Sequence, residues 1–128
     1  MILLDTHAWI WWATASPSLS KNARAAISAD NERGVLVVSC WEVAMLVEKG
    51  RIEFDRDASK WVRDALAVPG IVLLDLTPET AVAAARLGPG FRGDPIDRMI
   101  AATALALGCP VATKDRRLRD YEPLRTIW

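Results

Sequence analysis

Acidic side chains stand just after several short apolar runs of this chain. These acids are Asp5, Glu42 and Asp115, and two more, Asp94 and Asp97, open the helical segment that leads to the last of the runs. Carboxylates gathered in one place repel each other unless a cation compensates their charge. Carboxylate oxygens without a His or Cys cluster suit Mg²⁺ or Mn²⁺ rather than zinc. If the fold brings these acids together, the sequence predicts a site for a hard cation.

Each acid also has a purely structural interpretation. Ser39 and Glu42 match a capping box, in which both side chains satisfy free N–H groups at the start of a helix. The segment 94–97 matches an N-cap followed by a proline and an acid in the first helical turn. Asp115 could cap a short helix, and Asp5 could begin a turn. Since one acid is enough to cap a helix, the joint arrangement predicts a site better than any single acid does.

The elements that must position these acids follow from the alternation of apolar and amphipathic segments. Strands are predicted over residues 2–4, 35–38, 71–74 and 110–113. Helices are predicted over residues 20–33, 40–49 and 58–68, from Thr77 onward and after Pro95, with Gly34 and Gly50 as stop signals for the first two. Continuous apolar strands are typical of a parallel sheet covered on both faces. We therefore expect an α/β fold with a mainly parallel, twisted sheet of four to five strands, whose ligands bind at the carboxyl edge.

Composition excludes several classes of protein. The 128 residues are 52% apolar and 25% charged, and a chain of this length buries about two-thirds of its surface, which predicts one domain over residues 1–128. The 16 basic and 16 acidic residues cancel, so no global field attracts nucleic acid or membranes. Cys40 and Cys109 form no metal-binding or disulfide pattern. The absence of a signal-peptide pattern and of a long apolar span predicts a cytoplasmic protein with no membrane segment.

Three blocks of the chain and its ending carry a resemblance to a known family. They read LLDTHAWIWW at 3–12, SCWEVA at 39–44, DPIDRMIAATA at 94–104 followed by VATKD at 111–115, and RTIW at 125–128. Together they resemble the PIN-domain ribonucleases, and within them the VapC-type toxins of bacterial toxin–antitoxin pairs. The resemblance implies a PIN-like three-layer fold with helices on both faces of the sheet, and it implies that residues 125–128 form the final strand.

The resemblance also implies a site and an activity. The metal-binding and catalytic carboxylates would be Asp5, Glu42, Asp97 and Asp115, with the Thr113 hydroxyl lining the site and with Thr6 and Asp94 as accessory neighbours. The implied activity is Mg²⁺-dependent endonucleolytic cleavage of RNA, with Mn²⁺ as a substitute for Mg²⁺. The implied partners are a cognate VapB-type antitoxin, RNA and a second copy of the chain, and DNA only through the antitoxin.

Positive charge near the predicted site could contact RNA. Residues 86–119 carry seven Lys or Arg residues against three acids. The predicted RNA contacts are Arg92, Arg98, Lys114, Arg116 and Arg117. The alternative is an ordinary solvated surface with ion pairs. The glycine-rich segment 88–93 is either a mobile flap over the substrate or a simple connection.

The aromatic residues and the single histidine have less specific interpretations. Trp9, Trp11 and Trp12 crowd the first helical segment, where core packing is the default. Adjacent Trp11 and Trp12 cannot be buried on one helix face, so at least one could reach a partner surface. His7 is the only histidine, and we interpret it as a surface or packing residue rather than a metal ligand.

Two other functions are weighed against a nuclease. A phosphorylatable receiver-like module would also be a small parallel α/β domain, with Asp75 and Lys114 in its site. Receivers pair two acids after the first strand, however, whereas Thr6 and His7 follow Asp5 here. The second alternative is a catalytically silent PIN-like binding module, whose biological activity would survive mutation of Asp5.

Overall fold

The sheet at the centre of the molecule is parallel throughout. The computed structural model describes residues 1–128 and places β1 (Ile2–Leu4), β2 (Arg33–Leu36), β3 (Ile71–Leu74), β4 (Val111–Ala112) and β5 (Thr126–Ile127) in one sheet. The strand order is β3-β2-β1-β4-β5, and every neighbouring pair is parallel. The predicted α/β class and the final strand near residues 125–128 are therefore confirmed.

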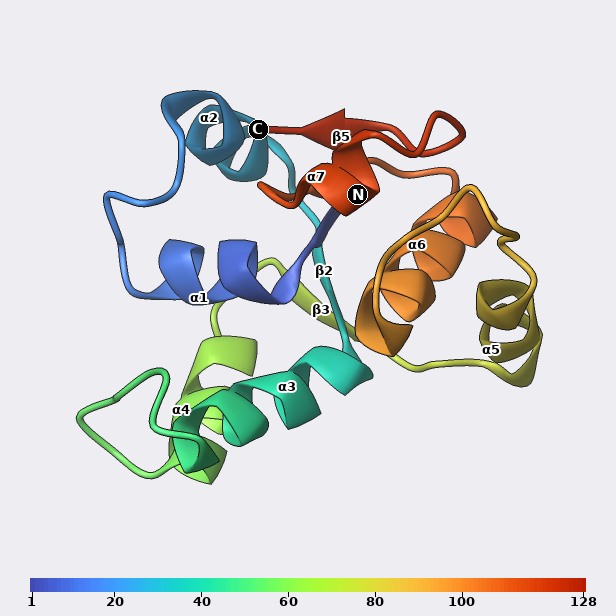
Figure 1. Ribbon diagram of the computed structural model, residues 1–128. Helices are drawn as coiled ribbons and strands as arrows, with labels where there is room; N and C mark the ends of the chain where they lie inside the picture. Colours follow the sequence, from blue (N-terminus) through green and yellow to red (C-terminus); the bar gives the residue numbers. More distant parts are fainter.

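Seven helices cover the two faces of this sheet. They are α1 (Thr6–Ala13), α2 (Lys21–Ala29), α3 (Val37–Glu48), α4 (Ala58–Leu66), α5 (Pro78–Ala85), α6 (Pro95–Leu107) and α7 (Arg116–Arg119). In Figure 1, α1 and α2 lie on one side of β1 and β2, and α5 and α6 lie on the other. None of these helices combines the length and the apolar character that crossing a membrane would require.

Two apolar clusters hold the three layers together. The strand β1 contributes to both of them, because successive side chains of a strand point to opposite faces. Ile2 and Leu4 pack in a cluster with side chains from α1 to α4, whereas Leu3 packs in a cluster with α6 and the segments around it. All three side chains of β1 are buried. The central strands are thus fixed from both sides, which also fixes the residues that follow them.

The boundary between β2 and α3 differs from the predicted one. The apolar run 35–38 does not form one strand, because β2 ends at Leu36 and α3 begins at Val37. Ser39 therefore lies inside the helix, and the N-cap residue Leu36 makes no side-chain capping hydrogen bond. The capping-box interpretation of Ser39 and Glu42 is wrong. The buried Ser39 hydroxyl instead accepts a hydrogen bond from Thr6 Oγ1 at 2.9 Å.

Gly34 also has a role other than the predicted one. The predicted helix 20–33 ends earlier, since α2 stops at Ala29, and its start is capped by Ser20, whose side chain accepts a hydrogen bond from Ala23 N. Gly34 lies inside β2, where a Cβ atom would come within 2.9 Å of Leu74 Cδ1. Close packing between strands, rather than helix termination, therefore explains this glycine.

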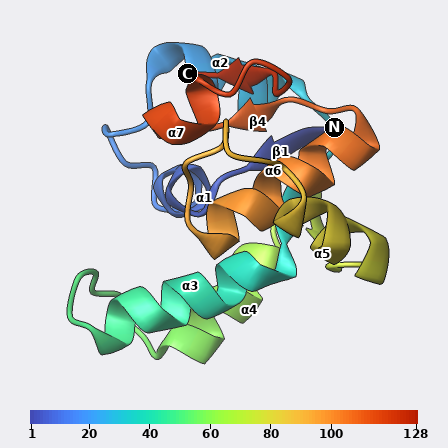
Figure 2. The same ribbon diagram turned by 45° about the vertical axis from the view of Figure 1, so that its right-hand side comes forward.

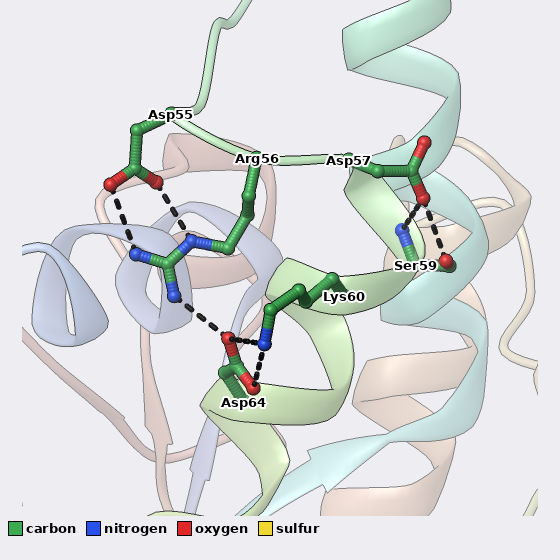
Figure 3. Close-up of polar contacts among 6 residues, drawn as sticks. All are labelled: Asp55, Arg56, Asp57, Ser59, Lys60 and Asp64. Atoms are coloured by element: carbon green, nitrogen blue, oxygen red, sulfur yellow. Dashed lines mark hydrogen bonds and ion pairs between the residues drawn. The ribbon is translucent and has the colours of Figure 1, made fainter.

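The helices α3 and α4 form a pair that extends from the rest of the molecule. Figure 2 shows them side by side, with the connecting segment 49–57 at the far end. A surface network of hydrogen bonds and ion pairs ties this segment to α4 (Figure 3). Arg56 bridges Asp55 and Asp64, both at 2.8 Å, and Asp57 caps α4 by accepting a hydrogen bond from Ser59 N at 3.0 Å. This network is structural, and it contains none of the predicted site residues.

Candidate active site

The predicted acidic residues meet in one pocket at the carboxyl edge of the sheet. The pocket has a volume of about 350 Å³. Its lining includes five acidic side chains, Asp5, Glu42, Asp94, Asp97 and Asp115, together with His7, Arg51 and Arg117. Residues from the end of β1, from α3, from the start of α6 and from the end of β4 thus come together. The fold therefore brings together the acids that were predicted to meet.

Asp5 and Asp115 are linked through Thr113. Because Leu4 and Ala112 are paired in the parallel strands β1 and β4, the residues that follow them are neighbours. Thr113 Oγ1 donates a hydrogen bond to Asp5 Oδ2 at 2.6 Å and accepts one from the backbone N–H of Asp115 at 3.0 Å. Asp5 is only 6% exposed, and its side chain makes no capping hydrogen bond to α1. The buried Asp5 side chain therefore lines the pocket and does not cap the helix.

Asp94 and Asp97 combine both interpretations that the sequence allowed. They form a reciprocal capping box at the start of α6: Asp94 Oδ1 accepts from Asp97 N at 2.9 Å, and Asp97 Oδ2 accepts from Asp94 N at 3.1 Å. The same two side chains line the pocket. Burial, reinforced by the negative charge of Asp94, raises the pKa of Asp97 to about 7. The capping box fixes the position of Asp97, and the burial of its carboxyl group disfavours ionisation.

The other acids of the pocket have different electrostatic surroundings. Burial raises the pKa of Asp5 more than the hydrogen bond from Thr113 lowers it. Burial also raises the pKa of Glu42, which the nearby hydroxyl of Thr6 opposes and the charge of Asp5 reinforces. Three carboxyl groups are therefore held against their mutual repulsion and against desolvation. A cation in the pocket would relieve both penalties.

Arg117 provides the one positive contact of the pocket with these acids. Its Nη2 lies 2.8 Å from Asp115 Oδ2 and 3.3 Å from Asp97 Oδ2, and its backbone N–H donates to Asp115 Oδ1 at 2.9 Å. Asp115 caps α7 in this way, as the sequence suggested. The guanidinium holds the pKa of Asp115 below its usual range.

The donor set of the pocket suits a hard divalent cation. Oxygen atoms of carboxylates are the ligands that Mg²⁺ and Mn²⁺ prefer, and Mg²⁺ takes only one or two of them directly while keeping several waters. No three of the acids converge on one point as a preformed cage. That arrangement is compatible with an ion bound partly through water. Asp5 and Asp97 are the two buried acids of the pocket, and Glu42 and Asp115 line it with them.

The predicted RNA-contacting residues have unequal surroundings. Lys114, Arg92 and Arg116 are exposed. Arg98, in contrast, donates from its guanidinium to the carbonyl oxygens of Ala84 at 3.3 Å and Phe91 at 3.2 Å. This arrangement favours a structural role for Arg98, which fastens the glycine-rich segment to α5.

The glycine-rich segment 88–93 is anchored to the body of the protein. Phe91 is only 2% exposed and contacts the ring of Tyr121 edge-on, with ring centroids 5.2 Å apart. The anchoring favours a connection over a mobile flap.

Two ionisable side chains of the pocket, besides its apolar lining, were not assigned to it by reasoning from the sequence. Arg51 enters it from the turn after α3, where Gly50 has a positive φ of 67° and Arg51 N–H donates to Leu46 O at 2.9 Å. Only Gly50 hinted at this turn. His7, interpreted as a surface or packing residue, is exposed but lines the pocket as well.

A model of the PIN domain matches residues 2–123. The chain belongs to the PIN-domain family. Membership confirms the predicted resemblance and excludes the receiver-like alternative, in which Asp75 would act. Asp75 follows the edge strand β3 and does not line the pocket.

Named relatives agree with this PIN-domain assignment. The chain is 36% identical to ribonuclease VapC22 of Mycobacterium tuberculosis (strain ATCC 25618 / H37Rv), over 99% of this chain and 98% of the relative. Its fold is similar to that of VapBC2 from Rickettsia felis bound to a promoter DNA fragment, with a TM-score of 0.72, 16% identity, and coverage of 98% of this chain and 97% of the other. DNA-bound VapBC from Salmonella typhimurium gives a TM-score of 0.70 at 17% identity, with 98% and 95% covered. The three-layer PIN-like fold is thereby confirmed.

Proposed function

We propose that this PIN-domain protein is a Mg²⁺-dependent endoribonuclease of the VapC type, the toxin of a toxin–antitoxin pair. The observation that carries the proposal is the pocket in which Asp5, Glu42, Asp97 and Asp115 gather, with Asp5 and Asp97 almost fully buried. Burying several carboxyl groups together is costly, and a cation-dependent reaction accounts for that cost. The similarity to a relative named as a ribonuclease supports RNA as the substrate.

The residues of the pocket have distinct roles in this proposal. When bound, the cation neutralises charge on the scissile phosphate and lowers the pKa of a bound water for in-line attack. Asp5 and Asp97 bind the cation, and Thr113 orients Asp5 through its 2.6 Å hydrogen bond. Glu42 and Asp115 orient water, and Mn²⁺ can substitute for Mg²⁺ because it accepts the same oxygen ligands. In this proposal Lys114, Arg92, Arg116 and Arg117 contact phosphate groups of the RNA.

Cleavage of total cellular RNA by the purified protein tests this function. We expect a few discrete products that require Mg²⁺ or Mn²⁺ and disappear with EDTA and with Asp5→Asn. A matched control is Asp75→Asn, which changes an exposed acid outside the pocket and should leave cleavage intact. Absence of cleavage by folded, metal-loaded protein would favour the silent binding module. Cleavage that survives both EDTA and Asp5→Asn would contradict the proposed site.

We also propose two protein partners for this chain. One is a VapB-type antitoxin, and the other is a second copy of the chain. Support comes from the structural neighbours, which are toxin–antitoxin complexes bound to DNA, so contact with DNA would run through the antitoxin. Trp41 of α3 supports an interface, because it is 61% exposed and Val37, one turn away, is 37% exposed. Trp12 is a weaker anchor, since the guanidinium of Arg33 covers its ring at 5.2 Å.

Sedimentation and antitoxin pull-down distinguish the contributions of Trp41 and Trp12 to assembly. We expect Trp41→Ala to weaken self-association or antitoxin capture and Trp12→Ala to leave both intact. Unchanged assembly in both measurements for Trp41→Ala would exclude this surface. A cytoplasmic location stays a prediction.

A further inference from the structure

A second hollow lies beside the acidic pocket. It has a volume of about 300 Å³ and is lined by Asp5, His7, Trp11, Lys114 and Asp115. Three of these residues, Asp5, His7 and Asp115, also line the acidic pocket. The two cavities are therefore adjacent, and a chain molecule bound at the acids would extend into the second hollow.

Aromatic side chains of α1 shape this hollow. His7 and Trp11 lie one helical turn apart, with ring centroids separated by 5.7 Å and planes inclined by 48°. Trp11 also contacts the ring of Trp128, at 5.8 Å and 54°. Neither neighbouring ring stacks flat on Trp11, so no parallel ring covers the indole. The Lys114 ammonium group lies over one face of the ring, and a base that stacks on this face displaces that exposed, flexible side chain. His7 is exposed, and Trp11 is half-buried.

A positive charge completes the hollow on the side of β4. Lys114 Nζ lies 6.0 Å from the centroid of the Trp11 ring. Lys114 is exposed and makes no ion pair with an acid, unlike Arg117, whose charge is shared by Asp97 and Asp115. The hollow thus combines aromatic surface with an available cation, directly beside the acids.

We propose that this hollow is a nucleobase subsite, in which an unpaired base next to the scissile phosphate stacks on Trp11 and His7 while Lys114 contacts a neighbouring phosphate. The inference rests on the proposed ribonuclease function and specifies the form of its substrate. Aromatic side chains bind bases of single-stranded nucleic acid by stacking, and a nearby Lys neutralises the backbone. Bases held in a helix are not available for such stacking. The subsite therefore selects a loop or an unpaired end of the RNA over a duplex.

Binding of a short single-stranded RNA carrying 2-aminopurine tests the subsite. The metal is Ca²⁺ in place of Mg²⁺, and a gel shows whether the RNA stays intact. Fluorescence anisotropy gives the affinity, and quenching of 2-aminopurine reports stacking, which a purely structural role of Trp11 would not produce. We expect Trp11→Leu to weaken binding by about 5- to 140-fold, the range for loss of one stacked base, and to remove the quenching. Trp11→Phe should restore most of both signals.

Matched variants make the result specific. Trp12→Leu removes the neighbouring indole on the same helix, which lies outside the hollow, and should leave RNA binding unchanged. Lys114→Gln should reduce the slope of log affinity against log salt by about 0.7, the contribution of one phosphate contact on a single strand, whereas Lys60→Gln should not. Since His7 is exposed, His7→Ala keeps the fold and tests the same stack if Trp11→Leu unfolds.

The outcomes separate this subsite from the function on which it rests. If the wild-type protein cleaves RNA while folded Trp11→Leu and His7→Ala bind it within twofold of wild type, only the subsite is wrong. If the wild-type protein neither binds nor cleaves RNA, the proposed function fails and the subsite with it. Equal binding of a hairpin stem and a single strand would also overturn the proposal.

Discussion

Arg117 and Asp97 are in ionic contact across the acidic pocket, with 3.3 Å between Arg117 Nη2 and Asp97 Oδ2. The same guanidinium binds Asp115 at 2.8 Å, so it joins the first turn of α6 to the start of α7. Asp97 is one of the two acids proposed to bind the cation, and Asp115 is proposed to orient water beside it. Arg117 therefore supplies internally some of the positive charge that Mg²⁺ would supply, and the two compete for the same oxygen atoms.

Removal of Arg117 should strengthen metal binding. We expect Arg117→Gln to raise the affinity for Mg²⁺ or Mn²⁺ by about two- to fivefold, as for loss of a partly exposed ion pair. Isothermal titration calorimetry measures this effect. Arg116→Gln is the matched control, because the Arg116 side chain is exposed and makes no ion pair. The affinity of this variant for metal should be close to that of the wild-type protein. An unchanged or lower affinity in Arg117→Gln would show that the guanidinium does not compete.

Thr113 should act on Asp5 rather than on the substrate. Thr113→Val removes both the donor to Asp5 and the acceptor for the Asp115 N–H at a fully buried position. We expect the free energy of unfolding to fall by about 1–3 kcal/mol and metal affinity to weaken. Urea unfolding and calorimetric titration measure the two effects. Thr113→Ser keeps the hydroxyl and should recover the metal affinity; if it behaves like Thr113→Val, the hydrogen bond is not the cause.

The raised pKa of Asp97 predicts an unusual dependence on pH. Between pH about 4 and about 7 the metal-free folded protein retains a proton on Asp97 that the unfolded chain releases. Rising pH therefore removes the contribution of this group to stability, which is the reverse of ordinary acid unfolding. Since metal binding needs the carboxylate, affinity should increase over the same range.

Thermal unfolding with and without Mg²⁺ measures this dependence. The increase in Tm caused by Mg²⁺ should be larger at pH 8 than at pH 6. In Asp97→Asn, which cannot ionise, that difference between the two pH values should shrink. An equal effect of Mg²⁺ at both pH values in the wild-type protein would contradict the raised pKa.

The fold and the acids of the site could be predicted from the sequence because both depend on local signals. Asp5 and Asp115 follow apolar runs, and parallel strands bring their carboxyl ends to one edge whatever the loops between them do. The proline and the acids at 94–97 specify a helix start that survives in the structure with its full capping box.

The features that were mispredicted depend on contacts between distant segments. The start of α3 at Val37 is not marked by composition, because the apolar run crosses the boundary and the Ser39 hydroxyl pairs with Thr6, 33 residues earlier. A list of basic residues does not predict that Arg98 contacts Ala84 and Phe91. It does not predict the contact of Arg117 with Asp97 either. The charge counts predicted a basic surface near the site. They did not show which of its basic side chains are free of contacts within the protein.

Gly93 should be required for the position of Asp97. A Cβ atom at Gly93 would lie 2.6 Å from Asp97 Cβ and would collide with the ring of the buried Phe91. Neither neighbour can move freely, because Phe91 is packed in the core and Asp97 is held by its capping box. We expect Gly93→Ala to lower the free energy of unfolding by about 1–3 kcal/mol, the usual cost of overpacking, and to weaken metal binding.

Gly90→Ala is the matched control for Gly93→Ala in the same segment. A Cβ atom there meets nothing within 4 Å, and the φ of Gly90 is not positive, so stability and metal affinity should stay near wild type. Urea unfolding and metal titration of both variants separate two explanations. If both alanines are harmful, the segment needs flexibility; if only Gly93→Ala is harmful, the close approach to Asp97 is what the glycine provides. Equal tolerance of both substitutions would mean that Phe91 and Asp97 can yield, and the packing argument would fail.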